Sequence, residues 1–210
     1  MVEYNKIMNI EKYKNDGWGL SKKCFLDIKE ILKPHNAPVV VEFGSGISTT
    51  FFKDLFNKYC NNGKIYSFDN DGKFASNISQ VKRLVECSDK DFNLMFSQGK
   101  YNSSKMNYRT TPPDTRQKNC FYDLSNSDIP SNIDLVLVDG PHGNGRSFSF
   151  LHVKDKIKKG GYIVIDDFNH YDFVERLLMI FPNAKEITTL ITERNKDSWE
   201  EGGNYTIYRV

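Results

Sequence analysis

The fold of this chain is decided by one stretch, residues 39–46, which reads VVVEFGSG. A β-branched run with apolar residues on both faces predicts a strand that helices bury from both sides. Gly44 and Gly46 follow this run, and residues 49–59 then carry apolar side chains at helical spacing. A glycine turn between a buried strand and a helix lets the backbone approach a ligand closely, so the stretch predicts an α/β domain with a binding site at this turn.

The same alternation continues on both sides of this stretch. Helices are expected at residues 21–32, 49–59, 74–81, 148–158 and 173–181, and strands at 39–43, 64–68, 83–87, 134–138, 162–165, 186–192 and 205–210. Regular alternation of strands and helices predicts a doubly wound, mostly parallel sheet. We expect an N-terminal arm and helix at residues 1–37 and the ligand-binding domain at 38–210, with a polar inserted loop at 97–119.

Composition narrows the classes of protein that the chain could belong to. It has 210 residues, a formal net charge of +2 and 39% hydrophobic residues, enough for the core of one domain. A net charge this close to zero argues against a dedicated polybasic nucleic-acid binder. No run approaches the roughly 18 apolar residues that span a bilayer, and no apolar segment near Met1 resembles a secretory signal. We therefore expect a cytoplasmic protein without nucleic-acid or membrane partners.

Acidic residues stand where the predicted strands end. They are Glu42, Asp69, Asp139, Asp166 and Asp167. Ligands of parallel sheets bind outside the carboxyl ends of the strands, so these carboxylates are candidates for an active site. A carboxylate at the end of the second strand can accept hydrogen bonds from both hydroxyls of a ribose. The negative charge before the glycine turn suits a cationic ligand better than a pyrophosphate.

These motifs together resemble those of class I S-adenosylmethionine-dependent methyltransferases. Residues 39–46, 66–69, 134–141 and 160–167 each resemble one strand-end motif of that family. The resemblance implies a seven-stranded Rossmann-like sheet with an antiparallel last strand, and S-adenosylmethionine as the methyl donor. It also implies a cofactor site formed by Glu42, Gly44, Ser45, Gly46, Thr49, Asp69, Asn70, Asp89 and Asp139. In this site Glu42 would lie near the amino group of the cofactor, Asp69 would hold the ribose, and Asn70 or Asp89 would border the adenine.

Two subgroups of that family resemble the chain further. Metal-dependent small-molecule O-methyltransferases place three acidic ligands at positions that match Asp139, Asp166 and Asp167, which implies Mg²⁺ or another divalent cation. The glucuronoxylan O-methyltransferase group carries stretches similar to residues 138–143 and 145–146. Both comparisons imply a hydroxyl acceptor, and the second implies a sugar. A metal-free site, in which a proton or a basic side chain offsets the three carboxylates, stays open beside the metal site.

The expected reaction is methyl transfer to a hydroxyl of a sugar or another small acceptor. His142 would take the hydroxyl proton, with His170 as its rival, and Asp139 would orient the hydroxyl. Two alternatives are a small nicotinamide-dependent oxidoreductase and a non-catalytic module that binds S-adenosylmethionine. The dinucleotide fingerprint is imperfect, since Thr49 stands at its third glycine position, and this argues against the oxidoreductase. A homo-oligomer stays open.

Overall fold

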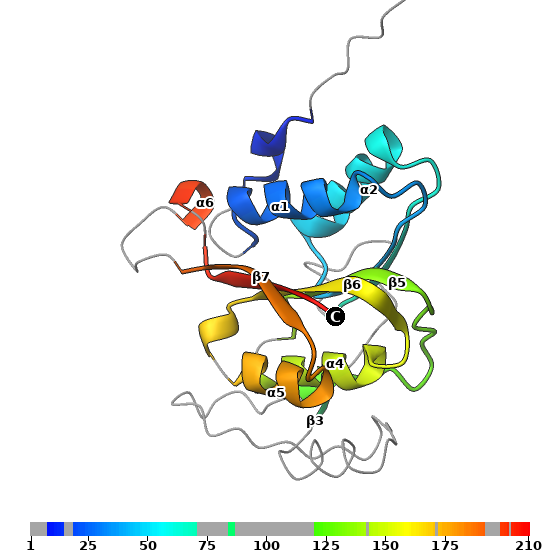
Figure 1. Cartoon of the computed structure of the whole chain (residues 1–210), viewed down its shortest axis with the longest axis vertical. Helices are drawn as coiled ribbons and strands as arrows, with labels where there is room; N and C mark the ends of the chain where they lie inside the picture. Colours follow the sequence, from blue (N-terminus) through cyan, green and yellow to red (C-terminus); the bar gives the residue numbers. More distant parts are fainter. Residues whose placement is uncertain are drawn as a thin grey trace, which may run out of the picture.

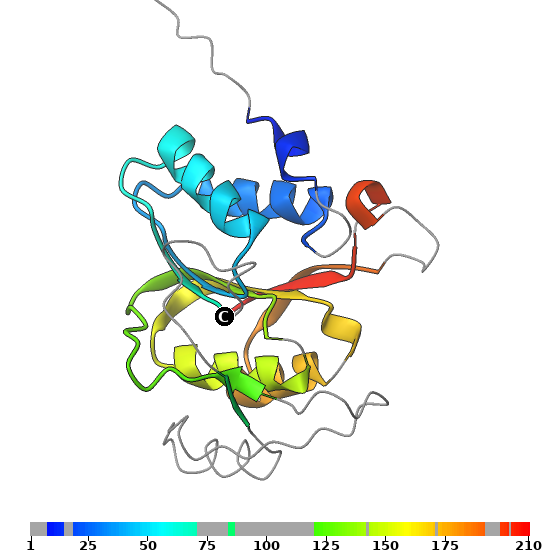
Figure 2. The same cartoon turned by 180° about the vertical axis from the view of Figure 1, so that it is seen from behind.

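A computed structural model describes residues 8–14, 19–70, 84–86, 120–141, 143–170, 172–191, 198–201 and 203–210. These residues form three layers, with a central sheet between two pairs of helices (Figure 1). The same layers are seen from behind in Figure 2. The helix expected at residues 74–81 and the loop expected at 97–119 lie outside the described residues.

The central sheet has six strands in the described part of the chain, in the order β2-β1-β5-β6-β8-β7. Their bounds are β1 (Val39–Phe43), β2 (Lys64–Phe68), β5 (Ile133–Val138), β6 (Ile157–Asp166), β7 (Lys185–Leu190) and β8 (Tyr205–Arg209). Strands β2, β1, β5 and β6 are parallel, and β8 runs antiparallel to its neighbours β6 and β7. The doubly wound, mostly parallel fold with an antiparallel last strand is confirmed.

The strand expected at residues 83–87 is not part of the central sheet, where the sequence placed it. It is present as β3 (Leu84–Glu86), but it pairs antiparallel with β4 (Cys120–Tyr122) in a separate two-stranded sheet. The described residues therefore give the central sheet six strands rather than seven. The sequence analysis did not predict β4, because three residues are too few to show an alternating pattern.

Helices α1 (Lys22–Leu32) and α2 (Ile47–Tyr59) cover one face of the sheet, and α4 (Phe148–Val153) and α5 (Phe173–Ile180) cover the other (Figure 1). Ser21 caps α1, since its side chain accepts a hydrogen bond of 3.2 Å from the backbone N of Cys24. Short helices are η1 (Ile10–Tyr13), η3 (Asn144–Ser147), η4 (Phe168–His170) and α6 (Ser198–Glu201). Among the described residues, no helix has the length and hydropathy that crossing a membrane requires.

The helix expected at residues 148–158 is shorter than predicted. It ends at Val153, and the chain then enters β6 at Ile157, where it pairs with Ile133 of β5. The strand continues through Gly160, whose φ of +81° is in the left-handed region. Pairing with β5 thus overrides the helical spacing of the apolar residues, which is a long-range effect that the local pattern does not contain.

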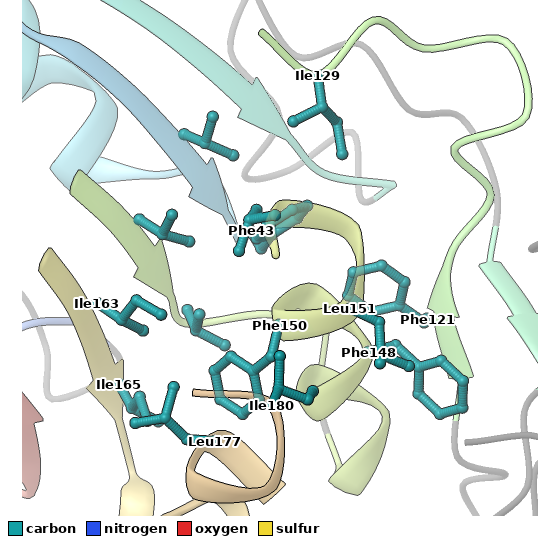
Figure 3. Close-up of a cluster of buried hydrophobic side chains, with 14 of the residues drawn as sticks. Phe43, Phe121, Ile129, Phe148, Phe150, Leu151, Ile163, Ile165, Leu177 and Ile180 are labelled. Carbon is teal, nitrogen blue, oxygen red and sulfur yellow. The ribbon is translucent and has the colours of Figure 1, made fainter. Parts of the chain in front are cut away.

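Each face of the sheet has its own hydrophobic core. Val40 of β1 packs toward α1 and α2, whereas Val41 and Phe43 pack toward α4 and α5. Figure 3 shows the second core, in which Phe43 and Phe121 lie near the phenylalanines of α4. The apolar residues on both faces of β1 are therefore buried as the sequence predicted, and the carboxyl ends of the strands are held in fixed positions.

Candidate active site

The predicted site residues meet at one edge of the sheet. Strands β1, β2, β5 and β6 are parallel, so Glu42, Asp69, Asp139 and Asp166 all lie at the edge where these strands end. Backbone hydrogen bonds join the segments that follow the strands. The N of Gly44 donates to Phe68 O at 2.9 Å, and the N of Asp139 donates to Phe43 O at 2.8 Å.

The glycine turn after β1 packs directly against the turn after β5. Gly44 has a φ of +101°, and a β-carbon added to it would lie 2.7 Å from the N of Gly140. A β-carbon added to Gly140 would lie 2.8 Å from the Cα of Gly44 and would overlap the hydroxyl of Tyr122. Gly46 differs, because a β-carbon added there would meet none of the described atoms within 4 Å. The open side of the turn, where a ligand can approach, is therefore at Gly46.

Glu42 is fully buried and supports this turn from inside the protein. Its carboxylate accepts hydrogen bonds of 2.6 Å from the hydroxyls of Thr49 and Ser67, and a third from the hydroxyl of Ser48. Burial raises the pKa of Glu42 to about 7, although these three hydrogen bonds oppose the rise. Thr49 also accepts a hydrogen bond of 3.2 Å from the N of Gly46. The expected contact of Glu42 with the amino group of a ligand stays a prediction.

Asp69 connects the end of β2 to the same turn. Its Oδ2 accepts a hydrogen bond of 2.8 Å from the N of Ser45, and the hydroxyl of Ser45 lies 2.5 Å from that of Ser67. Asn70 follows and is exposed. The glycine turn and Asp69 are thus joined by a hydrogen bond, and Asn70 continues from them to the exposed side. Asp89, the other residue expected near the adenine, lies outside the described residues.

Asp139 and Asp166 form a pair across the ends of β5 and β6. A side-chain hydrogen bond joins the two carboxyl groups. Burial is the main cause that raises the pKa of both groups, and that of Asp166 lies well above its ordinary value. Both residues keep partial exposure, which leaves the pair within reach of a ligand.

Arg146 of η3 fixes the loops that follow these two strands. Its Nε donates to Pro141 O at 2.8 Å, and a terminal nitrogen donates to Asp166 O at 3.1 Å. The positive charge opposes the rise in pKa of both Asp139 and Asp166. The sequence analysis noted the Gly-Arg pair only as part of a resemblance. An arginine in a glycine-rich loop just after a strand-end aspartate was the signal that could have identified it.

The structure gives no support to the metal site expected at Asp139, Asp166 and Asp167. Asp167 has a φ of +52°, and its carboxylate Oδ2 lies 3.8 Å from Nδ1 of His170. Within the ranges that the structure describes, no three or more His, Cys, Asp or Glu side chains gather where they could hold a metal ion. Among the described residues, the positive charge that acts on both Asp139 and Asp166 is that of Arg146. His142, the expected base, lies outside the described residues, and His170 is exposed in η4.

Several solved structures share the overall fold, whereas no curated protein matches the chain. A precorrin-6y C5,15-methyltransferase from Geobacter metallireducens has 13% identity and a TM-score of 0.51, over 94% of this chain and 92% of that one. A SAM-dependent O-methyltransferase from Thermotoga maritima has 13% identity and a TM-score of 0.46, over 89% and 64%. An rRNA methylase from Streptococcus thermophilus has 12% identity and a TM-score of 0.40, over 87% and 93%. At these identities the likeness concerns the fold alone.

A family model, described as a methyltransferase domain, matches residues 41–168. The match covers more than half of the chain and runs from β1 to η4, so it includes the glycine turn and every acidic strand end described above. The antiparallel direction of β8 is the one that the resemblance implied for the last strand. The chain therefore belongs to the methyltransferase-domain family, within the class I S-adenosylmethionine-dependent methyltransferases.

Proposed function

We propose that this methyltransferase transfers the methyl group of S-adenosylmethionine to a hydroxyl of a sugar or another small acceptor. The observation that carries the proposal is the Asp139–Asp166 pair, which is partly exposed beside the glycine turn. The carboxyl oxygens of Asp139 have acceptor capacity beyond this pair, which suits a hydroxyl that must be held in line for transfer. Because the chain belongs to a methyltransferase family, the alternative of an oxidoreductase is set aside.

The residues at the turn fit the cofactor. Gly46 faces open space, Gly44 packs closely on Gly140, and Asp69 offers a carboxylate at the end of β2. We assign Asp69 to the ribose hydroxyls, residues 44–46 to the methionine part and Asn70 to the border of the adenine. When bound, the cofactor supplies a methyl group on a positively charged sulfur. Glu42 and Thr49 would act through the turn, since their polar groups bind each other.

The chemistry that remains for the protein is positioning and removal of one proton. Asp139 would orient the acceptor hydroxyl, and Asp166 is hydrogen-bonded to Asp139. His142 directly follows Pro141 in the sequence, and its imidazole can accept the proton that the hydroxyl loses.

Binding of S-adenosylhomocysteine by calorimetry tests the cofactor assignment. Asp69→Asn should weaken binding at least tenfold, because hydrogen bonds to a charged group contribute about 1.5–3 kcal/mol. An asparagine can still accept the hydrogen bond from the N of Ser45. Asp54→Asn is the matched control, since Asp54 is a carboxylate on α2 that accepts a hydrogen bond from Tyr13. Equal affinity in both variants would show that the cofactor lies elsewhere.

The acceptor is tested separately by transfer of a labelled methyl group to a panel of compounds. The panel should contain monosaccharides, small phenols and RNA, because the expectation of no nucleic-acid acceptor rests on the sequence alone. Methylation of a sugar or another small hydroxyl compound would support the proposal. Methylation of RNA alone would contradict it, and cofactor binding without any transfer would favour the non-catalytic module.

A further inference from the structure

Tyr122 reaches the candidate site from β4, a strand outside the central sheet. Its side chain is 1% exposed, and its ring stacks on that of Phe43 with centroids 6.3 Å apart and an interplanar angle of 15°. The ring of Phe121 lies at 5.5 Å on a tilt. These contacts belong to the core in Figure 3, where Phe43 and Phe121 are labelled. The apolar core therefore fixes the ring and leaves only the hydroxyl at the strand ends.

The hydroxyl of Tyr122 lies among the charged groups of the site. It is so close to Gly140 that a side chain there would overlap it. Burial raises the pKa of Tyr122 well above its ordinary value, the charges of Asp69 and Asp139 raise it further, and Arg146 opposes them. The phenol is therefore neutral and keeps a proton that it can donate.

Among the described residues the structure shows no hydrogen bond that engages this hydroxyl, and the hydroxyl does not belong to the fully buried polar atoms that lack a partner. A phenol hydroxyl can both donate and accept a hydrogen bond, so this one can serve a ligand that reaches the strand ends. The site is otherwise rich in acceptors, and the two nitrogens of Arg146 that have printed partners donate to backbone carbonyls. A bound cofactor carries oxygens that need donors, and the Tyr122 hydroxyl is placed to supply one.

We propose that Tyr122 is a further cofactor-binding residue, whose hydroxyl donates a hydrogen bond to an oxygen of the bound S-adenosylmethionine beside Asp69. The inference rests on the proposed function and extends it. Asp69 accepts hydrogen bonds from the ribose, and Tyr122 serves as the complementary donor. Because the phenol is neutral, it adds no negative charge to a site that already holds Asp69, Asp139 and Asp166.

The test is binding of S-adenosylhomocysteine to Tyr122→Phe, which keeps the ring and its packing on Phe43. We expect affinity to fall about five- to tenfold, where tenfold corresponds to about 1.4 kcal/mol, with the melting temperature of the unliganded protein unchanged. Tyr208→Phe is the control. It removes a hydroxyl that donates to Glu186 at 3.2 Å, and it should leave the affinity unchanged.

The possible outcomes separate this inference from the one it rests on. If the unaltered protein binds no S-adenosylhomocysteine, the proposed function fails and the inference fails with it. If the unaltered protein binds and Tyr122→Phe binds equally well, only the inference is overturned. A change confined to the KM of the acceptor, with cofactor affinity intact, would also overturn it, because Tyr122 would then contact the acceptor instead.

Discussion

Replacing Glu42 by glutamine should make the stability of the unliganded protein less dependent on pH. Burial raises the pKa of Glu42 from an ordinary value of 4.5 to about 7 in the folded state. Between these two values the folded protein keeps the proton while the unfolded chain has lost it. The free energy of unfolding therefore falls as the pH rises through this window, and it levels off above pH 7.

The expected magnitude follows from the two pKa values. They differ by about 2.5, and each pH unit corresponds to about 1.4 kcal/mol, so ionisation of Glu42 costs about 3 kcal/mol above pH 7. A glutamine has the same shape and can pair with the hydroxyls of Ser48, Thr49 and Ser67, but it does not titrate. The free energy of unfolding of Glu42→Gln should therefore rise relative to the unaltered protein by about 3 kcal/mol between pH 4.5 and pH 8.

Urea denaturation at half-unit steps from pH 4.5 to 8 measures this difference. Taking the difference between the two proteins removes most of the contribution of other groups, such as Asp166, whose pKa is also raised. Glu30→Gln is the control, because the Glu30 side chain is 63% exposed and should give a curve parallel to that of the unaltered protein. A parallel curve for Glu42→Gln as well would refute the reasoning, since it would mean that Glu42 is ionised in the folded protein throughout the window.

The remaining predictions concern the two turns and the charge balance of the site. Gly140→Ala should lower the free energy of unfolding by about 1–3 kcal/mol, because its methyl group would overlap the hydroxyl of Tyr122 and press on Gly44. Gly46→Ala should change stability by less than about 1 kcal/mol yet weaken the binding of S-adenosylhomocysteine, since its methyl group enters open space. Urea denaturation compares the two variants, and a stable Gly140→Ala protein or a strongly destabilised Gly46→Ala protein would contradict the respective statement. Methyl transfer should continue in the presence of a chelator, because the charge of Arg146 acts on both Asp139 and Asp166; a loss of activity that Mg²⁺ or Mn²⁺ restores would show that a metal is needed.

The sequence predicted the parts of the fold that local patterns determine. The run at residues 39–43 has apolar residues on both faces, and the structure buries both faces of β1 under different helices. Ser21 is a strong capping residue, and it caps α1. The predicted start of β6 was wrong. The strand begins at Ile157 because this residue pairs with Ile133 of the neighbouring strand, and the spacing of residues around position 157 does not show that pairing.

The sequence also predicted which edge of the sheet carries the site, since parallel strands end at the same edge. It did not predict which carboxylates face the protein and which face the open side. Glu42 ends in a buried set of three hydroxyls, whereas Asp139 and Asp166 stay partly exposed. The burial of Glu42 depends on Ser67 of the next strand and on the first turn of α2. It therefore could not be predicted from the position of Glu42 next to a glycine turn.

The charge balance of the site is a property of the assembled structure and of no single motif. Three acidic residues at matching positions implied a cation. The structure adds a positive charge that this motif does not contain, because Arg146 donates hydrogen bonds to the carbonyl oxygens of Pro141 and Asp166. The contact of Tyr122 with Gly140 also joins segments that are far apart in the sequence. The glycine after Asp139 was interpreted through a motif, whereas its lack of a side chain is required by Gly44 on one side and by a hydroxyl from β4 on the other. A motif can thus identify where the chemistry lies, but the partners that set its charge and its donors come from segments that no local pattern connects to it.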